Sequence, residues 1–429
     1  MTRRGAVLLL APLPLVGLGA AFSPLLVLGL ALEGLGVVAI IVDYSRAPGR
    51  SRLRVVRSHD DVLAAGRANL IQLQVSVDGG PLGAVIRDEY PPVMAASATL
   101  LRARLPASVA YALTPPARGT WRFGGTVVRV AGPWRLAERQ TRLPTEAEVR
   151  VDPDLSAVRV YEALSRRGQL AELGVRALRR AGEGTEFERV RDAVPDDPLR
   201  SINWRATART GRLMATELIP ERAQPVIVCL DHGRLMGVGA GALTKLDHAI
   251  TAALLLVHVA LRSGDRAGLL SFDDHVTSLV RPRPGRAQLR VVLDAMAPLR
   301  AGETEADYGA ALGQLSTWQR RRALLAIFTD VLDPDQGAEL VRQCARLRRR
   351  HLPLVVTVRD PGLDDVSRQP PVDPAATYAR AVAGRLLRER EDTLRVLRRS
   401  GVETIDADAR TLSPRLVNRY LELKRRAVL

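Results

Sequence analysis

The feature that most constrains this chain is a pair of long apolar runs at its N-terminus. Residues 5–22 and 24–42 are almost wholly apolar, and each run is about long enough to cross the hydrocarbon core of a bilayer, which is about 30 Å thick. A short turn at Ser23 and Pro24 separates them. The sequence therefore predicts a hairpin of two transmembrane helices over residues 1–50.

Arginines flank this hairpin and predict its orientation. Arg3 and Arg4 precede the first run, and five arginines between residues 46 and 57 follow the second. Because basic flanks stay on the cytoplasmic side, we expect a multi-pass protein of the cell membrane with its soluble domains in the cytoplasm. A signal peptide is an alternative, since residues 19–21 resemble a small-residue cleavage site. The second run would still deliver the following residues to the cytoplasm.

The net charge of +17 raises nucleic acid as a possible partner. However, all but two of the 63 basic residues are arginines, and the chain is also rich in Ala, Leu, Val and Gly, which is typical of a bias in composition. Aromatic residues make up only 4% of the chain and leave few platforms for stacking bases. The two cysteines and six histidines show no zinc-ligand spacing. Nucleic-acid binding is therefore a secondary alternative.

Residues 52–151 read as a β-rich domain. Residues 70–77 alternate between apolar and polar side chains, and Asp78-Gly79-Gly80-Pro81 then marks a turn. Several further short strand candidates follow, with turn residues between them. This pattern favours a small sandwich-like domain, with Trp121 and Phe123 on one face of a strand as core residues.

A basic connecting segment covers residues 152–222. It begins with a predicted helix over residues 155–180 and continues into a region dense in Arg, Asp, Asn and Trp. There we expect a short helix with Asp197 as N-cap and Gly211 as its C-terminal stop. Arg200 and Trp204 would stack one turn apart, with the indole substantially buried. The candidate binding residues of this segment are Glu186, Asp196, Asp197, Arg200, Asn203, Trp204, Arg205 and Arg209.

Three motifs in this segment carry a family resemblance. They are Gly-x-Gly-Thr-Glu-Phe-Glu, Asp-Asp-Pro-x-Arg-x-Ile-Asn-Trp and Ala-Thr-Ala-Arg-Thr-Gly-x-Leu, in that order. The chain resembles the domain-of-unknown-function family numbered fifty-eight, the MoxR-associated membrane proteins with a von Willebrand factor A-like domain. The preceding apolar runs and β-rich segment fit the layout of that family. Asn203 is a departure, because the family often has Asp at that position, and a role that needs a carboxylate there is in doubt.

Residues 223–429 alternate between strand and helix patterns, which predicts a mostly parallel, doubly wound α/β sheet. The fold class is thus α/β, a von Willebrand factor A-like domain preceded by a β-sandwich-like domain and the transmembrane hairpin. Asp231 ends one predicted strand, and Asp330 directly follows another. Because such sheets bind ligands beyond the carboxyl ends of their strands, both acids should meet at one edge.

In von Willebrand factor A-like domains, this edge holds Mg²⁺ through an Asp-x-Ser-x-Ser motif, a Thr and a further Asp. Here Gly233 and Leu235 replace both serines. Asp231, Thr304 and Asp330 are the remaining candidate metal ligands, and three oxygen donors make a degenerate site for a hard cation. We expect no bound cofactor, and we expect Asp231 either to pair with Arg234 or to cap backbone amides.

The chain shows no nucleophile elbow, phosphate-binding loop or supported catalytic triad. We therefore expect a membrane-anchored, non-enzymatic adaptor or scaffold. The resemblance implies a MoxR-type AAA+ ATPase as partner, in assembly or maturation of other proteins. A metal-dependent hydrolase using Asp231 and Asp330 is the alternative from the enzyme class.

The topology of the hairpin can be tested with reporters fused after Leu429. Because basic flanks are retained in the cytoplasm, a reporter that is active only in the cytoplasm should be active at that position. A reporter that requires export should be silent there, and its activity would contradict the predicted orientation.

Overall fold

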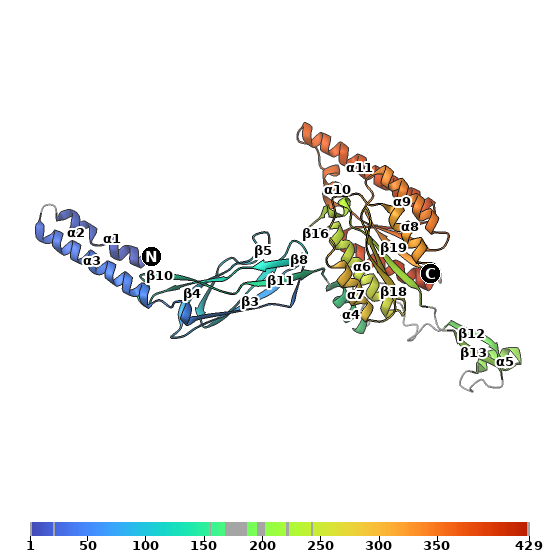
Figure 1. Ribbon diagram of the computed structural model, residues 1–429, viewed down its shortest axis with the longest axis horizontal. Coiled ribbons are helices and arrows are strands. Elements are labelled where there is room, and N and C mark those ends of the chain that lie inside the picture. Colours follow the sequence, from blue (N-terminus) through green and yellow to red (C-terminus); the bar gives the residue numbers. More distant parts are fainter. Residues whose placement is uncertain are drawn as a thin grey trace. The chain divides into compact units, whose positions relative to one another are not determined.

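The computed structural model describes residues 2–19, 22–154, 156–167, 187–194, 202–219, 223–241 and 243–426 (Figure 1). The chain divides into a β-rich unit, Met1–Asp154, and an α/β unit, Leu155–Leu429. The elements of the β-rich unit are helices α1 (Arg3–Leu10), α2 (Leu13–Leu18) and α3 (Ser23–Arg46), and strands β1 (Leu53–Ser58), β2 (Val62–Ala64), β3 (Asn69–Val77), β4 (Leu82–Asp88), β5 (Ala95–Ala96), β6 (Leu101–Leu105), β7 (Ala107–Thr114), β8 (Gly119–Phe123), β9 (Thr126–Ala131), β10 (Glu138–Leu143) and β11 (Ala147–Asp152).

Helix α3 is long and apolar enough to cross a membrane. Its 24 residues include an 18-residue window with a mean hydropathy of 2.6. Only 11% of this window is buried inside the protein. Pro24 lies in the first turn, where its missing N–H costs nothing, and the helix ends at Arg46, two residues before Pro48. An apolar helix with so much uncovered surface differs from the core helix of a soluble domain.

The expected hairpin of two full-length spans is not supported. Among the described helices only α3 meets the length and composition of a membrane span. Pro12 and Pro14 interrupt the first apolar run, which forms two short helices, α1 and α2, because a proline removes a helix hydrogen bond and clashes with the preceding turn. These helices pack along α3, where Gly29 approaches Val16 and Gly36 approaches Leu8.

The strands of the β-rich unit form three sheets, in the orders β1-β3-β7-β5, β10-β9-β4-β6 and β2-β11-β8. The pairings are antiparallel except for β2 with β11. Burial along β3 alternates as the sequence predicts, with Ile71, Leu73 and Val75 inside. Phe123 is fully buried, which confirms its place in the core, while Trp121 is half-buried.

The loop between β9 and β10, residues 132–137, fastens this β-structure to the helices. Asp43 at the end of α3 is fully buried, and its carboxylate accepts hydrogen bonds from the backbone N–H groups of Trp134 (2.7 Å), Leu136 (2.7 Å) and Ala137 (2.9 Å). Before α1, the backbone N–H of Thr2 donates to the carbonyl of Leu136 at 3.1 Å. We call this arrangement the Asp43 clamp.

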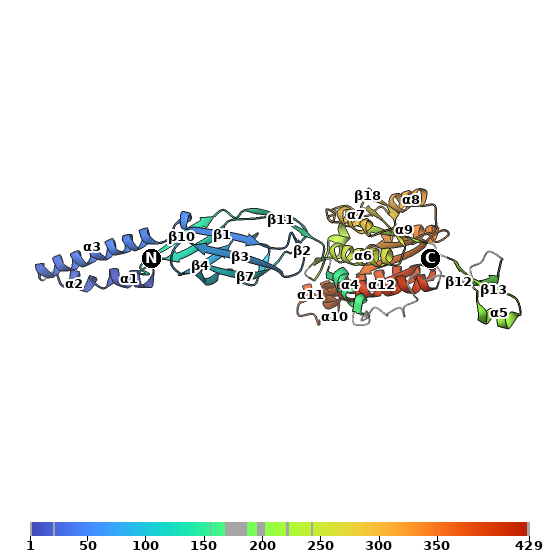
Figure 2. The same cartoon turned by 90° about the horizontal axis from the view of Figure 1, so that it is seen from below.

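The α/β unit contains a six-stranded sheet with helices on both faces (Figure 2). Its elements are α4 (Ser156–Arg167), β12 (Phe187–Asp192), α5 (Trp204–Thr210), β13 (Met214–Ile219), β14 (Pro225–Asp231), β15 (Gly239–Ala240), β16 (Leu243–Thr244), α6 (Lys245–Arg262), β17 (Arg266–Phe272), β18 (Val276–Arg283), α7 (Ala287–Met296), α8 (Tyr308–Trp318), β19 (Leu324–Phe328), α9 (Pro334–Leu347), β20 (Leu352–Val358), α10 (Pro361–Arg368), α11 (Pro374–Arg399), β21 (Glu403–Ala407) and α12 (Ala409–Arg425).

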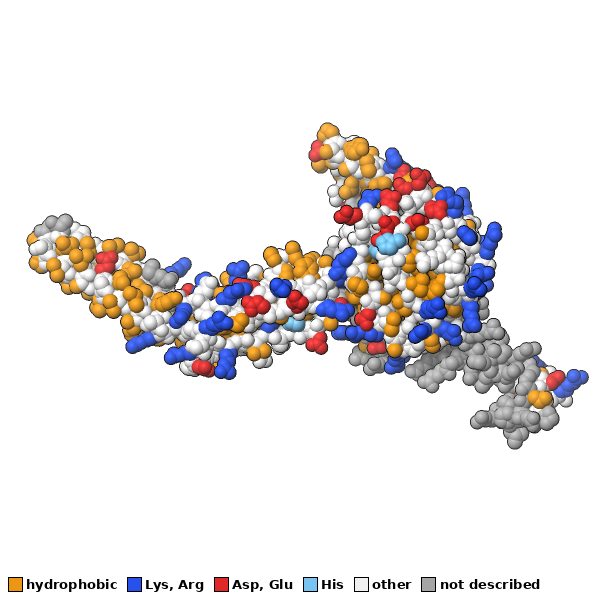
Figure 3. All heavy atoms as spheres, in the orientation of Figure 1, with side chains coloured by type: hydrophobic (Ala, Val, Ile, Leu, Met, Phe, Trp, Pro, Cys, Tyr) orange, Lys and Arg blue, Asp and Glu red, His pale blue; other side chains and the backbone are white. Residues whose placement is uncertain are grey.

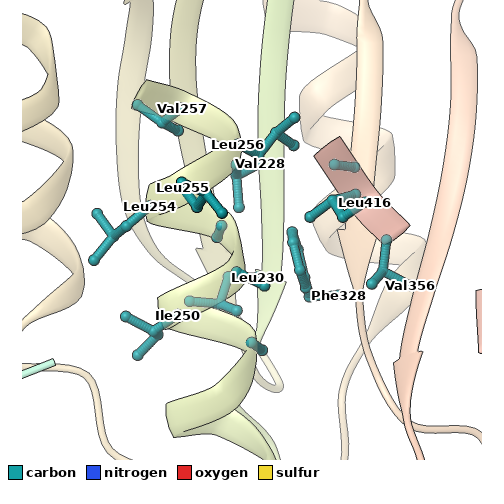
Figure 4. Close-up of a cluster of buried hydrophobic side chains, with 14 of the residues drawn as sticks. Val228, Leu230, Ile250, Leu254, Leu255, Leu256, Val257, Phe328, Val356 and Leu416 are labelled. Carbon is teal, nitrogen blue, oxygen red and sulfur yellow. The ribbon is translucent and has the colours of Figure 1, made fainter. Parts of the chain in front are cut away.

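The sheet order is β18-β17-β14-β19-β20-β21, and all neighbours are parallel except the antiparallel edge strand β18. Helices α6, α7 and α12 contribute to the core on one face, and α8, α9 and α11 to the core on the other. Side chains such as Val228, Leu230, Phe328 and Leu416 fill the first of these cores (Figure 4). The chain leaves β14 toward β17 on one side and returns to β19 on the other, so the strand order reverses between β14 and β19.

The segment with the family motifs contains a β-hairpin, β12 with β13, and α5 lies between its strands in sequence. The side chain of Asn203 caps α5 by accepting a hydrogen bond from the N–H of Ala206 at 2.9 Å. Gly211 ends the helix with a left-handed φ of 69°, which confirms the predicted C-terminal stop. The short helix begins later than expected, at Trp204, because Ile202 forms a β-bridge with Ala215 and Asn203 is the N-cap. Asp197, the expected N-cap, and residues 168–180 of the predicted basic helix lie outside the described residues.

The Asp43 clamp generates a stability prediction. Asp43→Ala leaves three backbone N–H groups without their acceptor, and each unpaired buried donor costs about 1–3 kcal/mol. We expect a loss of about 3 kcal/mol or more, measured by thermal or denaturant unfolding of the detergent-solubilised chain. Ser45→Ala, on the exposed side of the same helix end, serves as control and should change stability by less than about 0.5 kcal/mol.

Candidate functional site at the strand ends

The carboxyl ends of β14 and β19 bring Asp231, Thr329 and Asp330 to the point where the strand order reverses. All three are buried, with at most 3% of their surface exposed. Open α/β sheets bind ligands at this point because the adjacent connections leave in opposite directions. The structure therefore brings together two of the three residues that the sequence proposes as metal ligands.

Asp231 is held by donors from its own chain. Its Oδ1 accepts a hydrogen bond from the N–H of Gly233 at 2.7 Å, and its Oδ2 accepts one from the Thr329 hydroxyl at 2.6 Å. The Thr329 hydroxyl also shares a 2.7 Å hydrogen bond with the phenol of Tyr308. Burial raises the pKa of Asp231 to about 6, although both hydrogen bonds oppose this shift.

The second of the two expectations for Asp231 is the one observed. Its carboxylate caps a backbone amide, whereas Arg234 pairs with Glu305 at 2.7 Å on the exposed surface. The expected Asp231–Arg234 pair is therefore wrong. A guanidinium remains hydrated at the surface more cheaply than it enters the buried strand end.

Asp330 is enclosed by two cations of the protein itself. The ammonium of Lys245, at the start of α6, lies 2.5 Å from Oδ2 of Asp330, and both side chains are fully buried. The guanidinium of Arg390, on α11, contacts Oδ1 of the same carboxylate. The N–H of Val331 also donates to this oxygen at 2.9 Å. Both carboxylate oxygens of Asp330 are thus engaged.

The ionic network continues to the next strands. Arg390 also binds Asp406, on β21, at 2.8 Å, and Arg359 binds the other oxygen of Asp406 at 2.8 Å. Burial alone would lower the pKa of Arg390, but the charges of Asp330 and Asp406 outweigh it and raise that pKa. These residues line a polar pocket of about 190 Å³ beside α10 and α11.

The residues at the strand ends do not fit a Mg²⁺ site. Gly233 and Leu235 offer no side-chain oxygen, and the oxygens of Asp330 already face Lys245 and Arg390. Thr304 is exposed, and its backbone carbonyl accepts a hydrogen bond from the N–H of Arg234 at 2.8 Å. A divalent cation that bound Asp330 would have to approach two fixed positive charges. The ammonium of Lys245 and the guanidinium of Arg390 already neutralise this carboxylate, as a metal ion would.

The candidate binding residues of the motif segment are only partly described. Asn203, Trp204, Arg205 and Arg209 are placed on or beside α5, and the remaining four, Glu186, Asp196, Asp197 and Arg200, lie outside the described residues. The expectation of a buried Trp204 is wrong, because 65% of this residue is exposed. A helix usually buries only one face, and in the seven-residue helix α5 this face includes Ala206 and Thr207. The indole of Trp204 lies outside this face and remains exposed.

Sequence reasoning missed the cations of the strand-end site. Lys245 and Arg390 lie 85 and 60 residues from Asp330, too far for local spacing to relate them. One signal was present, because Lys245 and Lys424 are the only lysines in a chain with 61 arginines. Both lysines bind buried carboxylates, Lys245 with Asp330 and Lys424 with Asp265.

Together these features describe a protein with an apolar helix of membrane length, a β-rich unit and a doubly wound α/β unit in which one strand-end acid, Asp330, is neutralised by Lys245 and Arg390. Residues 189–372 match the family model described as protein of unknown function DUF58. A DUF58 domain is thus found in residues 189–372, and this range includes part of the segment that carries the three motifs.

The chain is also similar to several individual proteins. Uncharacterized proteins of Mycobacterium tuberculosis and Mycobacterium bovis are 28% identical over 239 residues, which cover 51% of this chain and 73% of each relative. A conserved hypothetical protein, BatB from Bacteroides thetaiotaomicron, is 13% identical, with a TM-score of 0.32, and covers 48% of this chain and 100% of its own. An uncharacterized membrane spanning protein from Vibrio fischeri is 17% identical, with a TM-score of 0.17, and covers 47% and 97%.

The buried Lys245–Asp330 pair generates a second stability prediction. Lys245→Met removes the ammonium while Arg390 remains, and breaking a buried ion pair in this way costs about 3 kcal/mol or more. The free energy of unfolding of the α/β unit should fall by that amount in denaturant titrations. Arg290→Met, which breaks the exposed pair with Asp294, is the control and should cost less than about 1 kcal/mol. Equal losses for the two variants would contradict the buried network.

Proposed function

We propose that this protein is a membrane-anchored, non-enzymatic adaptor, and that its α/β unit is a von Willebrand factor A-like domain that captures a partner protein at its strand ends. The observation that carries this proposal is the internal neutralisation of Asp330 by Lys245 and Arg390. An acid that is already paired has no capacity left to hold a catalytic metal or to act as a general base. Protein recognition at the surrounding surface requires neither.

The surface around the strand ends supports protein recognition through its charge. Although the whole chain carries a charge of +17, the loops that follow β17, α7 and β19 present several acids (Figure 3). We call Asp274, Glu303, Glu305, Asp333 and Asp335 the acidic rim; all five are exposed. Such a rim favours a partner with a basic surface, because complementary charges speed encounter and set orientation.

The resemblance of the motif segment implies a MoxR-type AAA+ ATPase as this partner. In the proposed arrangement, α3 holds the protein at the cell membrane, and the soluble units lie in the cytoplasm, where ATP is available. The adaptor would present the ATPase to membrane or client proteins during their assembly or maturation. The apolar helix and the five arginines between residues 46 and 57, at its C-terminal end, support this placement.

Two alternatives differ from the adaptor in their ligands. A metal-dependent hydrolase using Asp231 and Asp330 requires that Mg²⁺ or Mn²⁺ raise the melting temperature of the protein in a saturable manner. A nucleic-acid-binding protein using the arginine surface requires a steep dependence of binding on salt concentration. The pairing of Asp330 with Lys245 and Arg390 argues against the first, and the acidic rim argues against nucleic acid at the strand ends.

The acidic rim can be tested with purified, detergent-solubilised protein and a MoxR-type ATPase from the same organism. In Glu303→Gln/Asp335→Asn, two rim charges that take part in no described ion pair are removed with little change in shape. We expect ATPase binding to weaken about fivefold to tenfold in a calorimetric or interferometric titration, since rim charges contribute modestly to affinity.

The matched control is Asp61→Asn/Asp78→Asn, which removes two exposed acids of the β-rich unit. This variant should bind the ATPase as the parent does. Failure of the parent to bind would contradict the proposed partner, and equal binding by parent and rim variant would place the interaction on another surface.

A further inference from the structure

The Asp43 clamp places a set of basic and aromatic side chains where α3 leaves its apolar stretch. The guanidinium of Arg46 lies over the indole of Trp134, 5.4 Å from its centroid. The guanidinium of Arg139 lies over the phenol ring of Tyr44, 5.6 Å from its centroid. Arg135 follows Trp134 in the clamped loop. We call Arg46, Arg135 and Arg139, with Trp134 and Tyr44, the basic collar.

The charges of the collar are not neutralised within the protein. Among the described residues, none of the guanidiniums of Arg46, Arg135 and Arg139 forms an ion pair with a carboxylate, whereas many other arginines of the chain do. Arg46 and Arg135 are exposed, as are 48% of Trp134 and 48% of Tyr44. Three arginines without a carboxylate partner, at the end of α3 and in or beside the loop that binds Asp43, favour an anion from outside.

The backbone of Arg135 gives a second, independent indication. Its φ is 58°, and it is the only non-glycine residue with positive φ in the described part of the chain. A long side chain is disfavoured in this conformation, which glycine adopts freely. Strained positions of this kind gather at binding sites, where the surrounding structure holds them. The hydrogen bonds of Asp43 to Trp134 and Leu136, on either side of Arg135, supply that support.

The collar lies at the depth where a membrane presents its headgroups. Arg46 is the last residue of the 24-residue apolar helix, and α1 begins with Arg3 beside the clamped loop, because Thr2 binds Leu136. Tryptophan and tyrosine prefer this interfacial zone, and guanidiniums form paired hydrogen bonds with phosphate oxygens. Further into the helices, an apolar groove of about 340 Å³ runs between α1–α2 and α3 beside Leu8, Leu35 and Gly36, and it has the character of an acyl-chain site.

We propose that the basic collar binds the phosphate of an anionic phospholipid such as phosphatidylglycerol. This inference rests on the membrane anchoring in the proposed function, but it does not depend on the adaptor role or on the ATPase. Arg46 and Arg135 bind the headgroup, and Trp134 packs against its glycerol region. The lipid thereby joins α3 and the clamped loop at the membrane surface.

The test uses the full chain purified in detergent and incubated with phosphatidylglycerol or phosphatidylcholine, and native mass spectrometry counts retained lipids. The parent should retain phosphatidylglycerol at one molecule per chain in preference to phosphatidylcholine. Arg46→Gln/Arg135→Gln should lower the affinity for phosphatidylglycerol about 25-fold, since each basic residue near an anionic surface contributes about fivefold. Arg46→Lys/Arg135→Lys should recover part of the loss because the charge is kept.

Arg87→Gln/Arg102→Gln is the matched control, because it removes two exposed arginines of β4 and β6 that form no ion pair among the described residues. An equal loss in this control would show that net charge, and no defined site, retains the lipid. Equal retention of both lipids by the parent would overturn the proposal, and so would complete displacement of the lipid by inorganic phosphate, which would indicate a site for a soluble anion. Extraction of the chain from membranes by alkaline carbonate would instead contradict the membrane anchoring itself.

Discussion

The α/β unit depends on the buried charge of Asp330. One carboxylate at the end of β19 joins the start of α6 through Lys245 and the middle of α11 through Arg390, and Arg390 continues to Asp406 on β21. An unpaired charge at this depth would be very costly, so these elements must be in place together. The same pairing occupies the carboxylate at the point where open α/β sheets bind ligands, and in the proposed adaptor the acidic rim is the surface that recognises the partner.

Much of the α/β unit could be predicted from local patterns. The fully buried strands β14 and β19 are short apolar runs, and α6, α9 and α11 show helical periodicity, so their order in the chain predicts a doubly wound sheet. The structure contains each of these elements. The edge strand β18 is harder to predict, because none of its residues is fully buried and Pro282 lies within it, and a proline weakens the sequence signal of a strand.

Of the residues at the strand-end site, only those at the end of a strand or directly after it could be predicted from the sequence. Asp231 and Asp330 follow buried strands, and parallel strands bring such residues to one edge. Their partners could not be inferred in this way, since Lys245 and Arg390 reach Asp330 through tertiary packing alone. The prediction that Trp204 is buried was wrong because it relied on residue type alone. Large aromatic side chains are usually well buried, but α5 has only seven residues and does not cover this one. The Asp43 clamp had no local signal at all.

The confinement of both lysines to buried or nearly buried pairs has a chemical consequence. Lys245 is fully buried and Lys424 is 14% exposed at its side chain, so the described surface offers scarcely any side-chain primary amine. Acylating reagents and acetyl-transferring enzymes act on amines, and a guanidinium neither accepts an acetyl group readily nor loses its proton at physiological pH. The positive charge that the arginines carry is therefore permanent at physiological pH. Lysine acetylation cannot tune it, and cross-linkers directed at amines will find few attachment points.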